Sequence, residues 1–376
     1  MNIPFNVPCI TGNEQKYISQ VLESKKISGD GQFTKLCNKW LVDNIQCKKA
    51  LLTTSCTHAL EMAALLINIK DGDEIIMPSY TFVSTANAFV IRGGKPVFVD
   101  INPQTMNIDE KLIINALTSK TKAIVVVHYA GVSCEMNELQ RIAKNNNLYL
   151  IEDAAQAMMS TYENKMLGSF GDLSCFSFHE SKNYVCGEGG ALLINNDKFV
   201  ERAEIIREKG TNRSQFFRGE VDKYSWLDVG SSYLPSELNA AYLYAQFEMA
   251  DVINKDRLNS WNTYYKDLKI LAKNGHIELP VIPDKCKHNA HTFYIKLESI
   301  NVREKLQSFL KQRNIYATFH YVPLHSSIAG KKYGTFNGID NYTTRESDRL
   351  LRLPMYYKLK PEEVSYITSS IIEFFK

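Results

Sequence analysis

The chain has 376 residues, with 44 lysines and arginines against 41 aspartates and glutamates. This near balance of charge gives no reason to expect a nucleic-acid partner, and the length predicts one large domain with a smaller one. The N-terminus lacks a signal peptide and no apolar run reaches the eighteen residues of a membrane span, so we expect no membrane association and a cytoplasmic location.

Short apolar runs alternate with helix-like segments through the first half of the chain. A helical apolar stripe covers 33–41, strand-like runs cover 74–77, 96–99, 123–127 and 148–151, and helix-like segments cover 56–69, 81–92, 109–117 and 136–146. Further strand candidates are 173–178 and 190–194. Because alternating strands and helices imply right-handed crossovers, we expect an α/β fold with a mostly parallel central sheet.

The second half of the chain predicts a separate, smaller unit. Two long helical patterns, 196–208 and 236–272, lead out of the first domain. Beyond the proline-containing stretch 280–284, the pattern predicts a strand at 291–297, a helix at 302–313, a strand at 315–321 and a terminal helix at 361–375. We therefore predict a large domain over residues 1–250 and a smaller C-terminal α/β domain over residues 251–376.

Polar and aromatic side chains follow five of the apolar runs, where ligands bind in open α/β sheets. In chain order these groups are Thr54 to Thr57 after the further apolar run ALLT (50–53), Ser79 to Phe82, His128 with Tyr129, Glu152 to Gln156, and His179 to Lys182. The histidines form no HExxH motif, so the sequence predicts no metal site.

Such a set of side chains matches the needs of pyridoxal phosphate. This cofactor requires a lysine amine for its covalent imine link, a carboxylate beside its ring nitrogen, and a helix N-terminus with hydroxyls for its phosphate. A flat side chain against the ring face completes the requirements.

Six segments resemble motifs of one protein family, in the family's order and over almost the whole chain. They are PSYTFVSTANAF (78–89), VVVHYAG (125–131), IEDAAQA (151–157), CFSFHESKN (175–183), GEGG (187–190) and HYVPLH (320–325). They resemble the DegT/DnrJ/EryC1/StrS sugar aminotransferases, which have fold type I of the pyridoxal phosphate enzymes. The resemblance implies a large domain with the central sheet plus a smaller C-terminal α/β domain.

The resemblance also implies a role for each matching residue. Lys182 would carry pyridoxal phosphate and move a proton between the α-carbon of the amino acid and the cofactor. Asp153 would pair with the ring nitrogen, and Gln156 would bond the phenolic oxygen. Phe82 would stack on the ring, with Tyr80 as a rival. The phosphate contacts would come from Ser55, Cys56, Thr57 and Ser177.

Family sites are shared between two subunits, so the resemblance implies a homodimer. Many relatives carry an asparagine that reaches the partner's phosphate, and Ser232 stands at that position here. Serine donates a weaker bond, which puts this one contact in doubt.

Four further segments, at 210–219, 221–226, 230–234 and 343–354, resemble the enterobacterial transaminases that make dTDP-4-amino-4,6-dideoxygalactose. They imply nitrogen transfer from L-glutamate to dTDP-4-keto-6-deoxy-D-glucose, in enterobacterial common antigen or lipopolysaccharide synthesis. Arg213, Arg218 and Lys223 could clamp the diphosphate. His320 and His325 could face the same cleft.

Plain structural interpretations stay open for single residues. Asp153 or the Ser55 to Thr57 run could simply cap helices, and Ser177 could be only a strand residue. The histidines could have structural roles. The segment from Arg213 to Lys223 could be a solvated loop. A transaminase that makes the gluco 4-amino epimer or uses a 3-keto sugar is an alternative function. A non-catalytic nucleotide-sugar binding protein is another. Sugar deoxygenation is disfavoured, because those relatives have histidine in place of Lys182.

Overall fold

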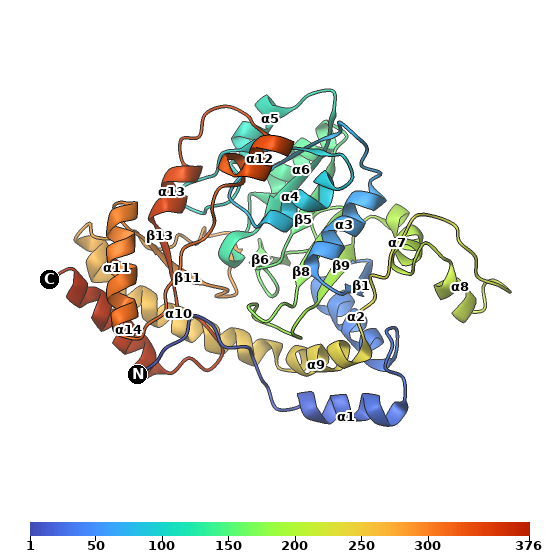
Figure 1. Ribbon diagram of the computed structural model, residues 1–376, viewed down its shortest axis with the longest axis horizontal. Helices are drawn as coiled ribbons and strands as arrows, with labels where there is room; N and C mark the ends of the chain where they lie inside the picture. Colours follow the sequence, from blue (N-terminus) through green and yellow to red (C-terminus); the bar gives the residue numbers. More distant parts are fainter.

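The computed structural model describes residues 1–376 and contains one dominant sheet at the centre of the molecule (Figure 1). Its eight strands lie in the order β1-β9-β8-β5-β4-β2-β3-β12. The bounds are β1 Lys49–Thr53, β9 Gly190–Ile194, β8 Leu173–Ser177, β5 Tyr149–Asp153, β4 Thr121–Val127, β2 Glu74–Pro78, β3 Lys95–Val99 and β12 Thr335–Phe336. Strand β9 is antiparallel to both neighbours and every other pair is parallel. The predicted mostly parallel central sheet is therefore confirmed.

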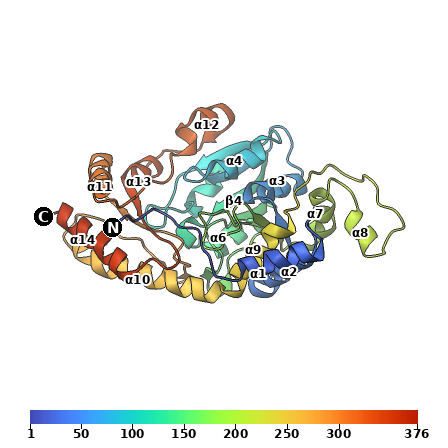
Figure 2. The same ribbon diagram turned by 60° about the horizontal axis from the view of Figure 1, so that its bottom comes forward.

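Both faces of this sheet are buried, because alternate side chains of a strand enter different hydrophobic clusters. In β2, Ile75 and Met77 join one cluster and Ile76 joins the other. The Ile75 face is covered by α3 (Cys56–Leu66), α4 (Val83–Val90) and α7 (Val200–Arg207). The Ile76 face is covered by α1 (Glu14–Ser24), α2 (Gln32–Ile45), α5 (Ile113–Ala116), α6 (Met136–Asn145) and α9 (Glu237–Glu248). Figure 2 shows these two layers of helices on either side of the sheet.

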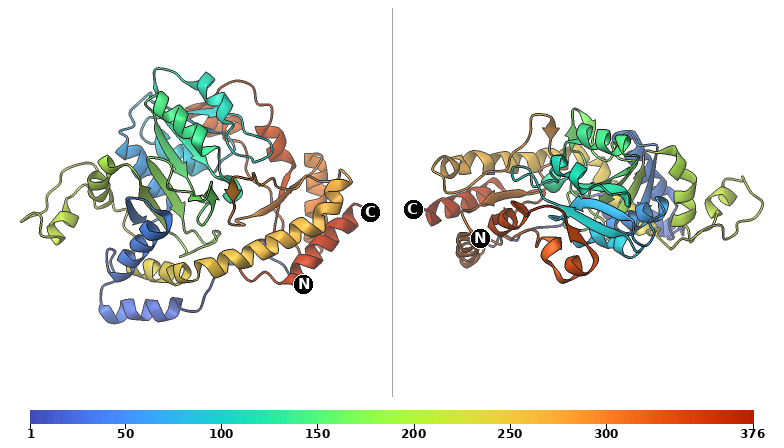
Figure 3. Two further views of the ribbon diagram at one scale, coloured as in Figure 1. Left: turned by 180° about the vertical axis from the view of Figure 1, so that it is seen from behind. Right: turned by 90° about the horizontal axis from the view of Figure 1, so that it is seen from above.

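The C-terminal part surrounds a third hydrophobic cluster, whose buried members come from 261–371 together with Ile3. Helices α10 (Ala250–Lys273), α11 (Ile300–Gln312) and α14 (Pro361–Phe374) accompany the antiparallel strands β11 (Phe293–Lys296) and β13 (Leu350–Leu353). Helix α10 runs from the large sheet to this part (Figure 3). The chain also crosses back, since β12 pairs with β3 and Ile3 bridges Ile315. The division near residue 250 stays a prediction.

Two predicted elements differ from the structure. The helical pattern at 236–272 is two helices, α9 and α10, and Met249 between them has a φ of −107° and a ψ of 13°, outside helical geometry. The strand predicted at 315–321 does not form. Two different segments meet it at single bridges, Ile315 with Ile3 and Thr318 with Arg352, so no ladder extends along it.

Shorter elements complete the fold. They are β6 (Thr161–Tyr162), β7 (Lys165–Met166) and β10 (Cys286–Lys287) in a small sheet, and helices α8 (Arg213–Phe217), α12 (Ile328–Tyr333) and α13 (Thr343–Arg349). The segment around α8 extends away from the rest of the molecule in Figures 1 and 3. None of the helices combines the length and apolarity needed to cross a bilayer. No group of three or more His, Cys, Asp or Glu side chains is placed to hold a metal ion.

Candidate active site

A cavity of about 620 Å³ opens where several strands of the large sheet end. We call it the Lys182 cavity. Nine of the predicted site residues line it, namely Ser55, Cys56, Thr57, Phe82, Asp153, Gln156, Ser177, Lys182 and His320. These residues are far apart in the sequence, and they meet because β1, β2, β5 and β8 all end at this edge of the sheet.

Lys182 lies in the loop that joins β8 to β9. The loop is closed by backbone hydrogen bonds from Phe178 to Gly189 (2.8 Å) and from Lys182 to the carbonyl of His179 (2.9 Å). Burial lowers the pKa of Lys182, while the thiol of Cys56 and the carboxylate of Asp153 act in the opposite direction. The amine is therefore neutral at a lower pH than the amine of a surface lysine, which favours attack on an aldehyde.

Asp153 is the last residue of β5 and is only 5% exposed. Its carboxylate accepts hydrogen bonds from the Thr85 hydroxyl (2.6 Å) and the Ala155 N–H (3.2 Å). Burial raises the pKa of Asp153, and these bonds and the charge of Lys182 oppose the rise. A protonated ring nitrogen beside this carboxylate would stabilise its ionised form.

The neighbouring carboxylate, Glu152, has a different role because successive strand residues point to opposite faces. It is fully buried and accepts hydrogen bonds from His128 (3.0 Å) and Ser174 (2.9 Å). Three backbone N–H groups, those of Gly168, Phe170 and Gly171, also donate to it. Glu152 thereby anchors the end of β5, and the adjacent Asp153 with it.

The start of α3 forms the third part of the cavity. Ser55 is the N-cap residue, and its side chain accepts a hydrogen bond from the His58 N–H (3.1 Å). The first N–H groups of a helix have no carbonyl partner within the helix and favour anions. Gly190 lies against this turn so closely that a Cβ there would be 2.4 Å from the Cys56 nitrogen. Only glycine permits this approach.

Two predictions about the ring contacts can be compared with the structure. Phe82 lines the cavity and is 55% exposed, whereas its rival Tyr80 is fully buried beside Tyr129 and does not line the cavity. Gln156 accepts a hydrogen bond from the Ala130 N–H (2.7 Å) and donates to the Tyr321 hydroxyl (3.0 Å). Its amide is thus held at the cavity wall.

Several cavity residues were missed by sequence reasoning. Tyr321 lies inside the HYVPLH motif and Arg352 inside the 343–354 segment, while His291 and Thr292 precede β11. They come from the C-terminal part, whose packing against the large sheet brings them to the cavity. Membership of a matching motif was the available signal for Tyr321 and Arg352.

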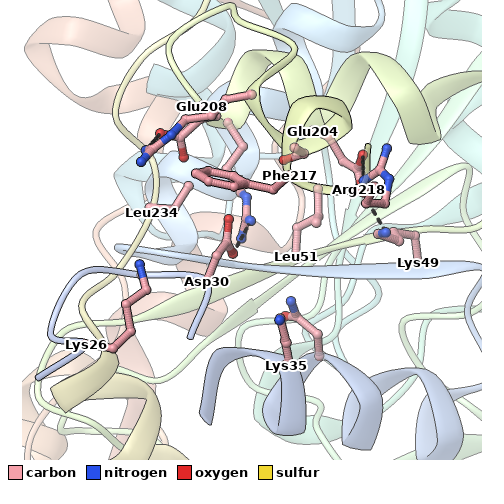
Figure 4. Close-up of a pocket in the computed structure, with 15 residues that line it drawn as sticks. Lys26, Asp30, Lys35, Lys49, Leu51, Glu204, Glu208, Phe217, Arg218 and Leu234 are labelled. Atoms are coloured by element: carbon pink, nitrogen blue, oxygen red, sulfur yellow. Dashed lines mark hydrogen bonds and ion pairs between the residues drawn. The ribbon is translucent and has the colours of Figure 1, made fainter. Parts of the chain in front are cut away.

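Five predicted residues do not line the Lys182 cavity. Two of them, Arg213 and Arg218, line a separate cavity of about 520 Å³, which we call the Arg213 cavity (Figure 4). Arg213 pairs with Glu208 (2.9 Å), and Arg218 pairs with Glu204 (2.9 Å). In Figure 4, Lys26 and Lys35 approach this cavity from the N-terminal segment, opposite Arg218.

The other three lie in neither of these cavities. Lys223 and Ser232 are exposed, and Ser232 forms a backbone bridge with Glu208. His325 bonds Ser79 (2.7 Å) and Asp340 (3.2 Å). The contacts of His325 support its structural interpretation, and within one chain Ser232 does not meet Lys182.

The fold and the Lys182 cavity define a class of protein, an α/β enzyme with a lysine, a buried carboxylate and a helix N-terminus at one sheet edge. The sequence profile of the DegT/DnrJ/EryC1/StrS aminotransferase family matches residues 8–372, so the chain belongs to this family. Enzymes of this family use pyridoxal phosphate, and this chain is accordingly a pyridoxal-phosphate-dependent sugar aminotransferase.

Individual relatives agree with this assignment. The chain is 31% identical to the GDP-perosamine synthase of Escherichia coli O157:H7, over 99% of this chain and 98% of the relative. It is similar to Helicobacter pylori PseC, an aminotransferase of pseudoaminic acid biosynthesis, with a TM-score of 0.90, 28% identity and coverage of 100% and 99% of the two chains. It is also similar to the pyridoxal phosphate form of Spr1654, a sugar aminotransferase of Streptococcus pneumoniae, with a TM-score of 0.90, 25% identity and coverage of 100% and 98%.

The residues of the cavity fit the cofactor. The donor set holds an amine in Lys182, a carboxylate in Asp153 and a helix N-terminus at Cys56, all on one cavity. The close approach at Gly190 keeps a side chain away from the backbone of that helix N-terminus.

Replacing Lys182 with alanine should abolish covalent attachment of pyridoxal phosphate, because no other lysine lines the cavity. Borohydride reduction followed by intact mass measurement checks this, with the exposed Lys287→Ala as control. Wild type and control should gain one cofactor mass and Lys182→Ala none. A labelled Lys182→Ala protein would contradict the assignment.

The lowered pKa of Lys182 predicts a shifted pH profile for cofactor uptake by the apoenzyme. The neutral amine is the nucleophile, so uptake should slow as the pH falls through this pKa and level off above it. The plateau in the uptake rate should begin at a lower pH than the plateau for Nα-acetyl-lysine. This reference amine reacts with the same aldehyde, so the cofactor's own titrations affect both profiles equally. Stopped-flow absorbance measures both reactions. Coinciding profiles would show that burial does not lower this pKa.

Proposed function

We propose that the chain transfers the amino group of L-glutamate to the 4-keto carbon of dTDP-4-keto-6-deoxy-D-glucose. The products are dTDP-4-amino-4,6-dideoxy-D-galactose and 2-oxoglutarate. The observation that carries transamination is the shared cavity of Lys182, Asp153 and the start of α3. The segments at 210–219, 221–226, 230–234 and 343–354 support this particular sugar. The name of the perosamine synthase supports a nucleotide-linked substrate.

Each half of the proposed reaction uses the same protein groups. When bound, pyridoxal phosphate draws electrons from the substrate carbon that carries nitrogen. Lys182 removes a proton from that carbon in glutamate and returns one to the sugar carbon in the second half. Asp153 would keep the ring nitrogen protonated, Gln156 would bind the phenolic oxygen, and Phe82 would pack against the ring.

The phosphate is proposed to lie at the start of α3. Ser55, Cys56 and Thr57 contribute there through backbone N–H groups and hydroxyls, together with Ser177 at the end of β8. Burial raises the pKa of the Cys56 thiol well above its usual value, so this thiol stays protonated beside the phosphate and does not act as a nucleophile.

Glutamate and the nucleotide sugar should each complete one half of the reaction in the same cavity. Incubation of the loaded enzyme with glutamate and dTDP-4-keto-6-deoxyglucose is therefore expected to yield 2-oxoglutarate and a 4-amino sugar. NMR of the isolated product checks the configuration at carbon 4. A gluco product would favour the epimer-forming transaminase, and no product in either half would favour a non-catalytic binder. Initial rates should follow a ping-pong pattern.

We further propose that the enzyme is a homodimer whose partner completes each site. The segment before Ser232 carries large exposed apolar side chains, with Trp226 81% and Phe217 69% exposed. Side chains of this size gathered on one projecting segment are typical of an interface. Such packing would bring Ser232 of one subunit toward the cofactor phosphate of the other. It would also bring Arg213 and Arg218, at the two ends of α8, toward the partner's sugar diphosphate.

A charge at Trp226 should dissociate this dimer. We expect Trp226→Glu to shift the protein toward monomers with loss of activity, because an interface would bury a charge without a partner. Light scattering over a concentration series measures the mass. Ile328→Glu is the control, since Ile328 is 91% exposed on α12, far along the chain. A fully active monomeric wild type would contradict the shared site.

A further inference from the structure

Arg352 is the one other lysine or arginine that lines the Lys182 cavity. It lies on β13, in the C-terminal part, whereas Lys182 lies in the loop between β8 and β9 of the large sheet. Its guanidinium lies 4.7 Å from the centre of the Phe5 ring, and one of its nitrogens donates to the carbonyl of Phe319 (3.2 Å). The side chain therefore has a fixed position but few polar contacts.

The polar contacts of Arg352 are incomplete. Its Nε is buried and has no hydrogen-bond partner, and no carboxylate of the chain pairs with it. Two arginines of the same region behave differently. Arg257 donates to three backbone carbonyls, and Arg349 pairs with Glu278 and Glu346. A guanidinium next to a cavity with free donors is ready to bind an anion from solution.

The charge of Arg352 acts on other groups that line the cavity. Burial is the main cause of the lowered pKa values of His320, Lys182 and His291. The positive charge of Arg352 lowers each of these pKa values further. The two histidines are thus held neutral, so the anion-binding strength of this side of the cavity rests on Arg352.

We propose that Arg352 binds a carboxylate of the amino-acid donor. This inference rests on the proposed transamination. The donor must place its amine at Lys182, and its carboxylates then need a cation within the same cavity. The planar guanidinium offers two parallel N–H groups, which match the two oxygens of a carboxylate. The keto sugar has no carboxylate, so Arg352 acts in the first half of the reaction and not in the second.

The test separates the two halves of the reaction with Arg352→Gln. The glutamate half is followed by the absorbance of the loaded enzyme. The variant should need at least about 30-fold more glutamate than wild type to reach the same rate, because loss of a buried charge partner costs 2 kcal/mol or more. The keto-sugar half, started from the aminated cofactor form, should keep its KM. Arg352→Lys should lie between, since it keeps the charge and loses the fork. Arg345→Gln, on the exposed neighbour that pairs with Glu346, is the matched control and should leave both halves unchanged.

A binding measurement without chemistry completes the test. Glutarate has two carboxylates and no amine, and calorimetry with the loaded enzyme should show it binding to wild type and about 30-fold more weakly to Arg352→Gln. A higher keto-sugar KM with unchanged glutarate affinity would overturn the proposal and assign Arg352 to the sugar diphosphate. If Arg352→Gln and Arg352→Lys both bound glutarate as tightly as wild type, the proposal would also be overturned. If wild type bound glutarate through Arg352 but aminated no keto sugar, the proposed function would fail and the carboxylate site would stand.

Discussion

The removal of one amine and one carboxylate from water is the constraint on which this site depends. Lys182 and Asp153 share a cavity at the edge of the sheet. Burial lowers the pKa of Lys182 and raises the pKa of Asp153, so it favours the neutral form of each group. A buried charge is costly unless it is paired, so both groups are poised to gain a partner. In the proposed site, pyridoxal phosphate would supply both partners, an aldehyde for the amine and a ring nitrogen for the carboxylate. The electrostatics of these two residues therefore fit the cofactor that the family uses.

The sheet holds these groups in place through strand geometry. Strand β5 ends in two carboxylates that point to opposite faces, and the structural one, Glu152, accepts five hydrogen bonds. Those bonds fix the backbone that carries Asp153 and leave the Asp153 carboxylate at the cavity. On the other side of the cavity, Gly190 at the start of β9 lets the strand lie against the first turn of α3. The anion-binding turn and the Lys182 loop are therefore parts of one packed unit.

Sequence reasoning succeeded where local rules decide position. Asp153 ends an apolar strand, and Ser55 and Lys182 follow two others. Residues at the ends of neighbouring strands meet at one edge whatever the details of packing. It favoured Phe82 over Tyr80 only from the resemblance, because both follow the same strand and burial, which separates them, is a property of the fold. Arg352 was missed because β13 reaches the cavity through packing between distant parts of the chain. His325 was predicted to face the same cleft as His320, yet it bonds Ser79 and Asp340.

The distribution of cations supports the proposal that two chains share each site. The Arg213 cavity is lined by six lysines and arginines against three carboxylates, whereas the Lys182 cavity has two cations, Lys182 and Arg352. If Lys182 binds the cofactor and Arg352 binds the donor, no lysine or arginine of that chain remains in the cavity for a sugar diphosphate. The diphosphate is negatively charged, and it loses the stabilisation of water when it binds against uncharged side chains. The projecting, apolar segment around α8 carries arginines that its own cavity cannot use for this purpose. In the proposed homodimer, the arginines at the ends of α8 would supply the positive charge that the Lys182 cavity of the other chain lacks for a sugar diphosphate.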